Sequence, residues 1–245
     1  MKRHIPNFIT TLNLACGVIS VTEVIQGNLV WSALFIFLAA VFDYLDGTAA
    51  RILNARSEIG KQLDSLADVV SFGVAPGLIM FQLMMAQYDA GGNVPEKFHF
   101  IPYLALLIPI GSALRLAIFN LDTRQEVNFI GLPTPANALF FASIPLILLL
   151  PAENFSLISL PFLVDFFSGI KVQMILTVFF SYLLISDYRL FSMKFKSLKM
   201  EGNQARYLFL GISLILCILF SYQAIPFIIG IYLFLSLAFQ KSMGS

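Results

Sequence analysis

Charged residues are scarce in this sequence, and so are cysteine and histidine. Asp, Glu, Lys and Arg make up 12% of the 245 residues, whereas hydrophobic residues make up 58%. A soluble domain carries about one-quarter charged residues, so this composition excludes an ordinary soluble protein and favours a chain buried in a bilayer. Cys16, Cys217, His4 and His99 lack the close spacing of zinc ligands, so neither a zinc site nor a disulfide framework is expected.

Apolar runs long enough to cross a bilayer recur along the whole sequence. Helices satisfy their own backbone hydrogen bonds in hydrocarbon, and about 20 apolar residues cross it. We therefore predict an all-α fold: a polytopic membrane bundle of about eight transmembrane helices in a single domain, residues 1–245. The predicted spans are 7–25, 29–50, 63–87, 100–120, 134–150, 170–187, 206–222 and 225–240, the last two forming a C-terminal helix hairpin, 206–240.

The basic residues predict how the bundle is oriented. Cytoplasmic loops retain Lys and Arg during insertion. With both termini cytoplasmic, the outer connections contain only Lys97 and Lys171, and the other thirteen of the 15 basic residues lie at the cytoplasmic ends. The basic loop 189–206 is explained by this rule without a further role. With a net charge of +1 and an apolar chain, no nucleic-acid partner is expected.

Four aspartates stand close together where the predicted second span ends and the third begins. Asp43 and Asp46 are three residues apart, and Asp64 and Asp68 are four apart. Residues at these spacings share one face of an α-helix, so each pair presents its carboxylates on one side. Because a short turn joins the two helices, both pairs are predicted to converge on one point near the cytoplasmic surface.

Such a group of acids needs compensating positive charge. Carboxylates at membrane depth are costly, and four close together repel one another. Oxygen ligands suit Mg²⁺, Mn²⁺ or Ca²⁺, and two such ions would balance the charge and suit displacement at phosphorus. The alternative is a set of interfacial ion pairs with Arg51, Arg56 and Lys61. The small residues Gly47 and Gly60 favour the metal site, because they leave room for a phosphate group.

This stretch resembles the CDP-alcohol phosphotransferase family, whose signature is D-x2-D-G-x2-A-R-x8-G-x3-D-x3-D. The matching positions are Asp43, Asp46, Gly47, Ala50, Arg51, Gly60, Asp64 and Asp68. The resemblance implies a cytidine-diphosphate-linked donor and release of CMP. It implies that the four aspartates hold divalent metal, Mg²⁺ or Mn²⁺ as two ions, and that Asp68 also removes the proton of the attacking hydroxyl.

The same resemblance assigns residues to the nucleotide. Gly47, Ala50, Arg51 and Gly60 would line the nucleotide diphosphate. The N-terminal PNFITTLN resembles the family's opening helix, which suggests that Asn7 and Thr10 contact the nucleotide. The alternative for these two residues is that they cap the first helix and face lipid headgroups.

A second region, 113–138, bears on the acceptor. It contains ALRLAIFN and FIGLPTPANA, which resemble the branch of the family that uses L-serine. Arg115 lies at the inner end of the fourth predicted span, where it either contacts a phosphate or the acceptor or extends to the headgroups. Gly131, Pro133 and Pro135 predict an irregular backbone that lines a polar cavity.

The expected activity is therefore transfer of a phosphatidyl group from CDP-diacylglycerol to L-serine, giving phosphatidylserine and CMP. The expected protein lies in the cell inner membrane among membrane lipids, with its active site facing the cytoplasm, and by family resemblance it is a homodimer. Two alternatives stay open. The acceptor could be glycerol-3-phosphate or inositol phosphate, or the intramembrane acids could belong to an ion-coupled transporter.

Overall fold

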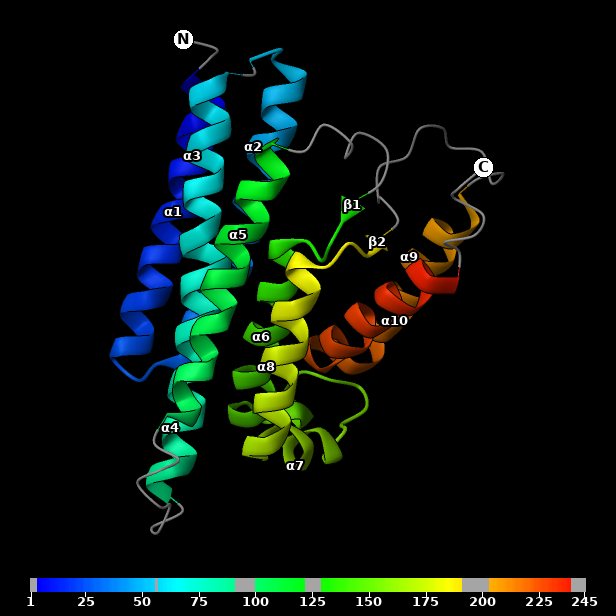
Figure 1. Ribbon diagram of the computed structural model, residues 1–245. Coiled ribbons are helices and arrows are strands. Elements are labelled where there is room, and N and C mark those ends of the chain that lie inside the picture. The colour runs from blue at the N-terminus through cyan, green and yellow to red at the C-terminus, as the bar shows by residue number, and fades with distance from the viewer. Residues whose placement is uncertain (1–3, 56, 91–99, 122–128, 191–202, 239–245) are drawn as a thin grey trace.

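The computed structural model describes residues 4–55, 57–90, 100–121, 129–190 and 203–238. Within these ranges the chain is helical apart from two short strands, which confirms the predicted all-α class (Figure 1). Arg56, Lys97, Arg124 and most of the basic loop 189–206 lie outside the described residues. The predictions made for these positions therefore stay predictions.

The helices follow one another up and down the bundle (Figure 1). The first half contains α1 (His4–Ile25), α2 (Leu29–Ile52), α3 (Glu58–Asp68), a π-helical segment η1 (Val69–Val74), α4 (Ala75–Ala90), η3 (Ile101–Leu106) and α5 (Leu107–Leu121). The second half contains β1 (Phe129–Ile130), α6 (Thr134–Leu149), η5 (Ala152–Asn154), α7 (Phe162–Ser168), α8 (Ile170–Ile185), β2 (Arg189–Leu190), α9 (Gln204–Phe220), η6 (Ser221–Ala224) and α10 (Ile225–Ala238).

The turn between α2 and α3 brings the two aspartate-bearing helices side by side. Asn54 adopts a positive φ of 49° just after α2 ends. Ser57 then caps α3, because its Oγ accepts a hydrogen bond from the backbone N–H of Gly60 at 3.0 Å. A serine at this position satisfies one of the N–H groups that have no partner within a helix, so α3 begins at a defined residue.

The span that continues from α3 through η1 to α4 departs from α-helical geometry directly after Asp68. Pro76 has no N–H, so it cannot bond the carbonyl of Phe72 as an α-helix requires. The Ser112 hydroxyl on α5 donates to this carbonyl instead, at 3.4 Å. Close packing on α5 depends on Gly73, where an added Cβ would lie 3.1 Å from the Ser112 Cβ. The segment η1, directly after Asp68, is thereby held against α5.

The start of α6 is fixed against the end of α8. Strands β1 and β2 pair antiparallel, and the backbone N–H of Leu132 bonds the carbonyl of Leu183 at 2.9 Å. Gly131 has a positive φ of 75°, and a Cβ there would collide with the carbonyl of Leu184. Only glycine combines this conformation with this approach, so the chain enters α6 along a defined path.

The structure contains several helical stretches that could span a membrane. Among the described residues, five helical stretches are long and apolar enough to cross a membrane, or six if α7 and α8, bent by 77°, count as one span. The predicted count of eight transmembrane helices therefore stays a prediction. With 16 residues, α6 is shorter than the ~20 residues that a full crossing needs.

The two C-terminal predicted spans, 206–222 and 225–240, correspond to α9 and α10. Arg206–Ala238 counts as one stretch by length and apolarity. The chain nevertheless turns at Ser221, whose φ is 49°, and the rings of Phe209 and Tyr232 have centroids 5.7 Å apart. In a straight helix these residues would be separated by roughly 34 Å, at 1.5 Å per residue. Helices α9 and α10 therefore fold back on one another.

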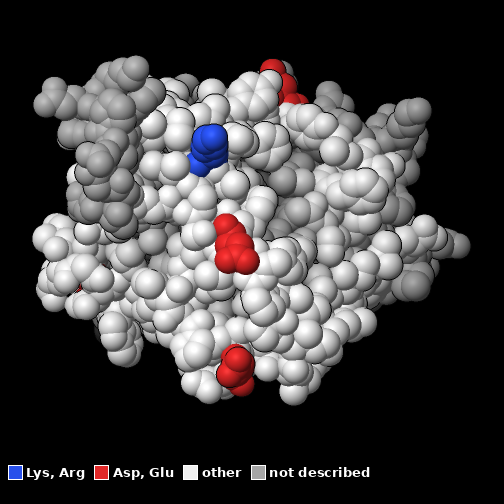
Figure 2. Space-filling model, turned by 90° about the horizontal axis from the view of Figure 1, so that it is seen from below, with Lys and Arg blue, Asp and Glu red and all other residues white. Residues whose placement is uncertain are grey.

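The two ends of the bundle differ in charge. Arg51 near the end of α2, Lys61 near the start of α3 and Arg206 near the start of α9 lie toward one end, as do the start of α1 and the end of α10 (Figure 1). Figure 2 shows the opposite end, whose described surface carries only scattered charges. This asymmetry is compatible with the positive-inside rule. The orientation of the protein in a membrane stays a prediction.

Candidate metal centre and nucleotide pocket

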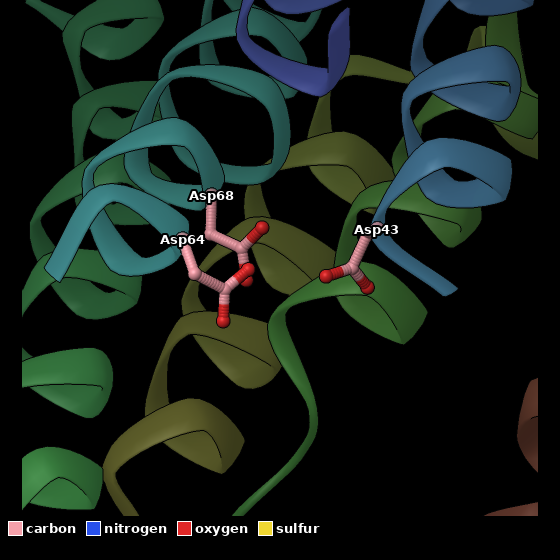
Figure 3. A group of neighbouring side chains, drawn as sticks. All are labelled: Asp43, Asp64 and Asp68. Atoms are coloured by element: carbon pink, nitrogen blue, oxygen red, sulfur yellow. The ribbon is translucent and has the colours of Figure 1, made fainter. Parts of the chain in front are cut away.

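Three of the four aspartates converge on one point between α2 and α3. One carboxylate oxygen each from Asp43, Asp64 and Asp68 lies within 4.8 Å of the others. Figure 3 shows Asp64 and Asp68 side by side on one helix, with their carboxylates toward Asp43 on the other. The helical spacing of the acids therefore produces the convergence that the sequence indicated.

Asp46 lies beside this group rather than within it. Its side chain is 5% exposed, and its Oδ2 has no hydrogen-bond partner among the residues that the structure describes. The same holds for Oδ1 of Asp64. Buried carboxylate oxygens without partners are costly, so each of these two atoms has capacity for a ligand.

The aspartate group has the donor set of a hard divalent cation. All its oxygens come from carboxylates, which Mg²⁺, Mn²⁺ and Ca²⁺ prefer. Several negative charges held together away from water repel one another unless cations balance them. The residues present therefore fit a divalent metal, with Asp43, Asp64 and Asp68 as its nearest candidate ligands.

Asn13 holds Asp68 from the neighbouring helix α1. Its Nδ2 donates to Oδ1 of Asp68 at 3.1 Å, and its side chain is fully buried. The Ser71 hydroxyl on η1 donates to the backbone carbonyl of Asn13 at 3.0 Å. This approach needs Gly17, because a Cβ there would collide with Ser71. Sequence reasoning did not assign Asn13. The signal that could have identified Asn13 is its spacing, because it lies three residues after Thr10 and so on the same face of α1.

A pocket of about 500 Å³ opens beside the aspartates. Its lining includes Asp46 and Asp64, so the pocket reaches the acids. It also includes five of the residues expected to bind the nucleotide: Asn7, Thr10, Gly47, Ala50 and Gly60. Ser57, Glu58 and Lys61 line it as well, without having been assigned to the nucleotide from the sequence.

Two of the arginines with predicted roles lie in different surroundings. Arg51 is exposed, and its guanidinium bonds along its own helix, with Nε donating to the carbonyl of Gly47 at 2.9 Å. Arg115 on α5 is 7% exposed and lies over the ring of Phe119, 5.7 Å from its centroid. Asp68 and Tyr232 are near enough to Arg115 to interact electrostatically. Arg115 is thus a buried basic residue that interacts with Asp68.

Comparison with known proteins decides the family. The sequence model of the CDP-alcohol phosphatidyltransferase family matches residues 3–183, from the start of α1 into α8. The chain belongs to this family. As a CDP-alcohol phosphatidyltransferase it is an enzyme of phospholipid synthesis, and its aspartate group accords with the divalent metal that the family uses. Helices α9 and α10 follow the matched segment.

Curated relatives of this CDP-alcohol phosphatidyltransferase have names that include serine. The chain is 38% identical over 133 residues to the CDP-diacylglycerol–serine O-phosphatidyltransferase of Bacillus subtilis, covering 54% of this chain and 70% of that protein. It is 36% identical over 143 residues to the archaetidylserine synthase of Methanothermobacter thermautotrophicus, and the match covers 57% of this chain and 56% of that protein. It is 34% identical over 135 residues to the CDP-diacylglycerol–serine O-phosphatidyltransferase of Helicobacter pylori, and the match covers 54% of this chain and 53% of that protein. The chain thus spans about half the length of the last two.

Proposed function

We propose that this enzyme transfers the phosphatidyl group of CDP-diacylglycerol to the hydroxyl of L-serine, giving phosphatidylserine and CMP. The observation that carries the proposal is the convergence of Asp43, Asp64 and Asp68 beside a pocket in a chain of this family. Serine as acceptor is supported by the names of the relatives.

Asp43, Asp46, Asp64 and Asp68 are proposed to hold two divalent ions, Mg²⁺ or Mn²⁺. Two ions of charge +2 would balance the four carboxylates. Asp46 belongs to the set because its buried Oδ2 is unpaired within the described part of the chain and it lines the pocket beside Asp64. When bound, such ions polarise a diphosphate and stabilise the charge of a departing phosphate.

The pocket formed by α1, α2 and α3, here called the donor side, is proposed to bind the cytidine diphosphate. Asn7 and Thr10 contact the nucleotide, and Gly47, Ala50 and Gly60 let the diphosphate approach the backbone. Arg51 reaches the diphosphate by leaving its bonds to its own helix, which an exposed side chain does at low cost.

Asp68 is proposed as the base. It takes the proton of the serine hydroxyl while the serine oxygen bonds to the phosphorus that carries diacylglycerol, and the bond from this phosphorus to CMP breaks. Asn13 keeps the Asp68 carboxylate in one orientation through its hydrogen bond to Oδ1. Arg115, buried near Asp68, supplies a positive charge for a phosphate or for the acceptor.

The protein is proposed to lie in the inner membrane of the cell as a homodimer, with the aspartates facing the cytoplasm. The five or six candidate spans found among the described residues support a membrane location. CDP-diacylglycerol would reach the site sideways from the inner leaflet, since its acyl chains are insoluble in water, whereas serine would arrive from the aqueous phase.

A CMP-release assay tests the proposal. Purified enzyme with CDP-diacylglycerol, Mn²⁺ and labelled L-serine should release CMP and form labelled phosphatidylserine, and a chelator should stop both. An acceptor panel with glycerol-3-phosphate and inositol phosphate should show turnover with serine alone. Failure to release CMP with serine, while a control enzyme of the family is active, would contradict the proposal. Solute uptake into liposomes without CMP formation would indicate a transporter instead.

A further inference from the structure

The first turn of α6 contains two buried side chains whose polar atoms are unpaired. Asn137 is fully buried, and neither its Oδ1 nor its Nδ2 has a hydrogen-bond partner among the described residues. Thr134 is 1% exposed, and its Oγ1 likewise lacks a partner in the described ranges. Buried amides are almost always hydrogen-bonded, so an asparagine with both ends free indicates a missing polar ligand.

The side chains of Thr134 and Asn137 face the same volume at the start of α6. Thr134 and Asn137 are three residues apart, so they share one face of α6. Side chains on an α-helix tilt toward its N-terminus, which points the Asn137 amide back toward the first turn. The N–H groups of Thr134 and Ala136 have no acceptor within the helix, and Pro135 has no N–H. The turn therefore gathers hydrogen-bond donors and one amide carbonyl.

This turn lies beside the aspartates, on the other side from the nucleotide. Helix α6 packs along α2, which carries Asp43, and against η1, which directly follows Asp68. Figure 3 shows the chain entering α6 next to Asp43. The described residues that line the donor-side pocket come from α1, α2, α3 and the turn before α3, not from α6. An in-line displacement places nucleophile and leaving group on opposite sides of phosphorus, so the acceptor belongs on the side of α6.

We propose that the first turn of α6 is the acceptor site, in which Thr134 and Asn137 bind the carboxylate and ammonium groups of an α-amino acid. The carboxylate accepts from the first N–H groups of the helix and the Thr134 hydroxyl, where the positive end of the helix dipole favours an anion. The Asn137 amide offers both a carbonyl for the ammonium group and an NH₂ for the carboxylate.

The chemistry of these groups discriminates among acceptors. An amino acid zwitterion has no net charge, and a hydroxyl, an amide and backbone N–H groups complement it without adding charge. Glycerol-3-phosphate and inositol phosphate are anions that call for several Lys or Arg side chains. On this side of the aspartates the described chain supplies Arg115. The start of α6 is also held in place, because the backbone N–H of Leu132 bonds the Leu183 carbonyl at the end of α8 and the N–H of Gly131 bonds the Tyr188 carbonyl just after it.

The inference rests on the proposed function, since it assigns that enzyme's acceptor, and steady-state kinetics test the two separately. Asn137→Ala removes both ends of the amide, and Thr134→Val replaces the hydroxyl with a group of similar shape. Asn137→Ala should raise the KM for L-serine by about ten- to a hundred-fold, the effect of losing hydrogen bonds to charged groups. The KM for CDP-diacylglycerol should stay within about two-fold, which also shows that the variant is folded.

Two controls match these variants. Ser143→Ala alters another fully buried side chain of α6, whose Oγ donates to its own helix at the Phe140 carbonyl, and should leave the KM for serine unchanged. Ethanolamine, which lacks the carboxylate, should be a poor acceptor for the parent enzyme, and Thr134→Val should reduce the preference for serine over ethanolamine.

The outcomes separate the two proposals. If the parent enzyme releases no CMP with serine, the proposed function fails. If it uses serine and Asn137→Ala leaves the KM for serine unchanged, the acceptor site is elsewhere and the buried amide holds only water. A near-isosteric variant, Asn137→Asp, places a negative charge beside the serine carboxylate and should raise the KM for serine even where Asn137→Ala is poorly folded. An unchanged KM in Asn137→Asp would overturn the inference as well.

Discussion

The donor side and the acceptor side of this site are built by different means. The donor side uses side chains at helical spacing on three consecutive helices, α1, α2 and α3, which are close in the sequence. The acceptor side uses the start of α6, whose position depends on strand pairing and on Gly131 against α8, more than 50 residues later in the chain. Local periodicity therefore defines one half of the site, and long-range packing defines the other.

Replacing the proposed base should have the largest effect. Asp68→Asn keeps the size of the side chain but removes the proton acceptor, so kcat should fall by about 10³-fold or more. Binding of CMP, measured by calorimetry, should be largely kept because the pocket residues are unchanged. Asp165→Asn on the exposed side of α7 is the matched control and should behave as the parent enzyme. Turnover comparable to the parent in Asp68→Asn would remove the role assigned to this residue.

A change in Asp43 should act through the metal. Asp43→Asn replaces one of the three converging carboxylates with a weaker ligand, so the Mn²⁺ concentration for half-maximal activity should rise by about ten-fold or more. A Mn²⁺ titration of CMP release measures this shift. An unchanged titration curve would exclude Asp43 as a metal ligand.

The support given by Asn13 should have an intermediate effect. Asn13→Ala leaves the Asp68 carboxylate in place but without its buried hydrogen bond, and kcat should fall by about ten-fold. The KM for CDP-diacylglycerol should change little, since Asn13 is not among the described lining residues of the pocket. Ser20→Ala is a suitable control, because Ser20 is equally buried on α1 but bonds Ser32. Equal losses in the two variants would mean a general effect on α1 packing.

The smallest expected effect is confined to the donor side. In Gly60→Ala the new Cβ would lie 2.9 Å from Oδ1 of Asn7, which must move within the pocket. The KM for CDP-diacylglycerol should rise by about five-fold while the KM for serine stays constant, the reverse of the pattern expected for Asn137→Ala. Gly211→Ala, where a Cβ meets nothing within 4 Å, should change neither value. A rise in the KM for serine in Gly60→Ala would mean that the two sides are not independent.

The aspartate cluster could be predicted from the sequence because the spacing of Asp43, Asp64 and Asp68 requires only helices and a short turn. The same reasoning missed Asn13, whose partner Asp68 lies 55 residues away and is reached only because Gly17 lets α1 approach η1. Hydropathy located the apolar runs, including the break before α10, but it measures only the length of such runs and could not show that α7 and α8 meet at an angle of 77°.

The position of the aspartates along their helices has a consequence for the membrane itself. They occupy the second half of α2 and the first turns of the long span that begins at Glu58, close to one end of the bundle. A lipid that reacts at this depth keeps its tails where they were and acquires its new headgroup on the same face. With the proposed orientation, the enzyme would add its product to one leaflet only, and equalising the leaflets would require a separate flippase or scramblase activity.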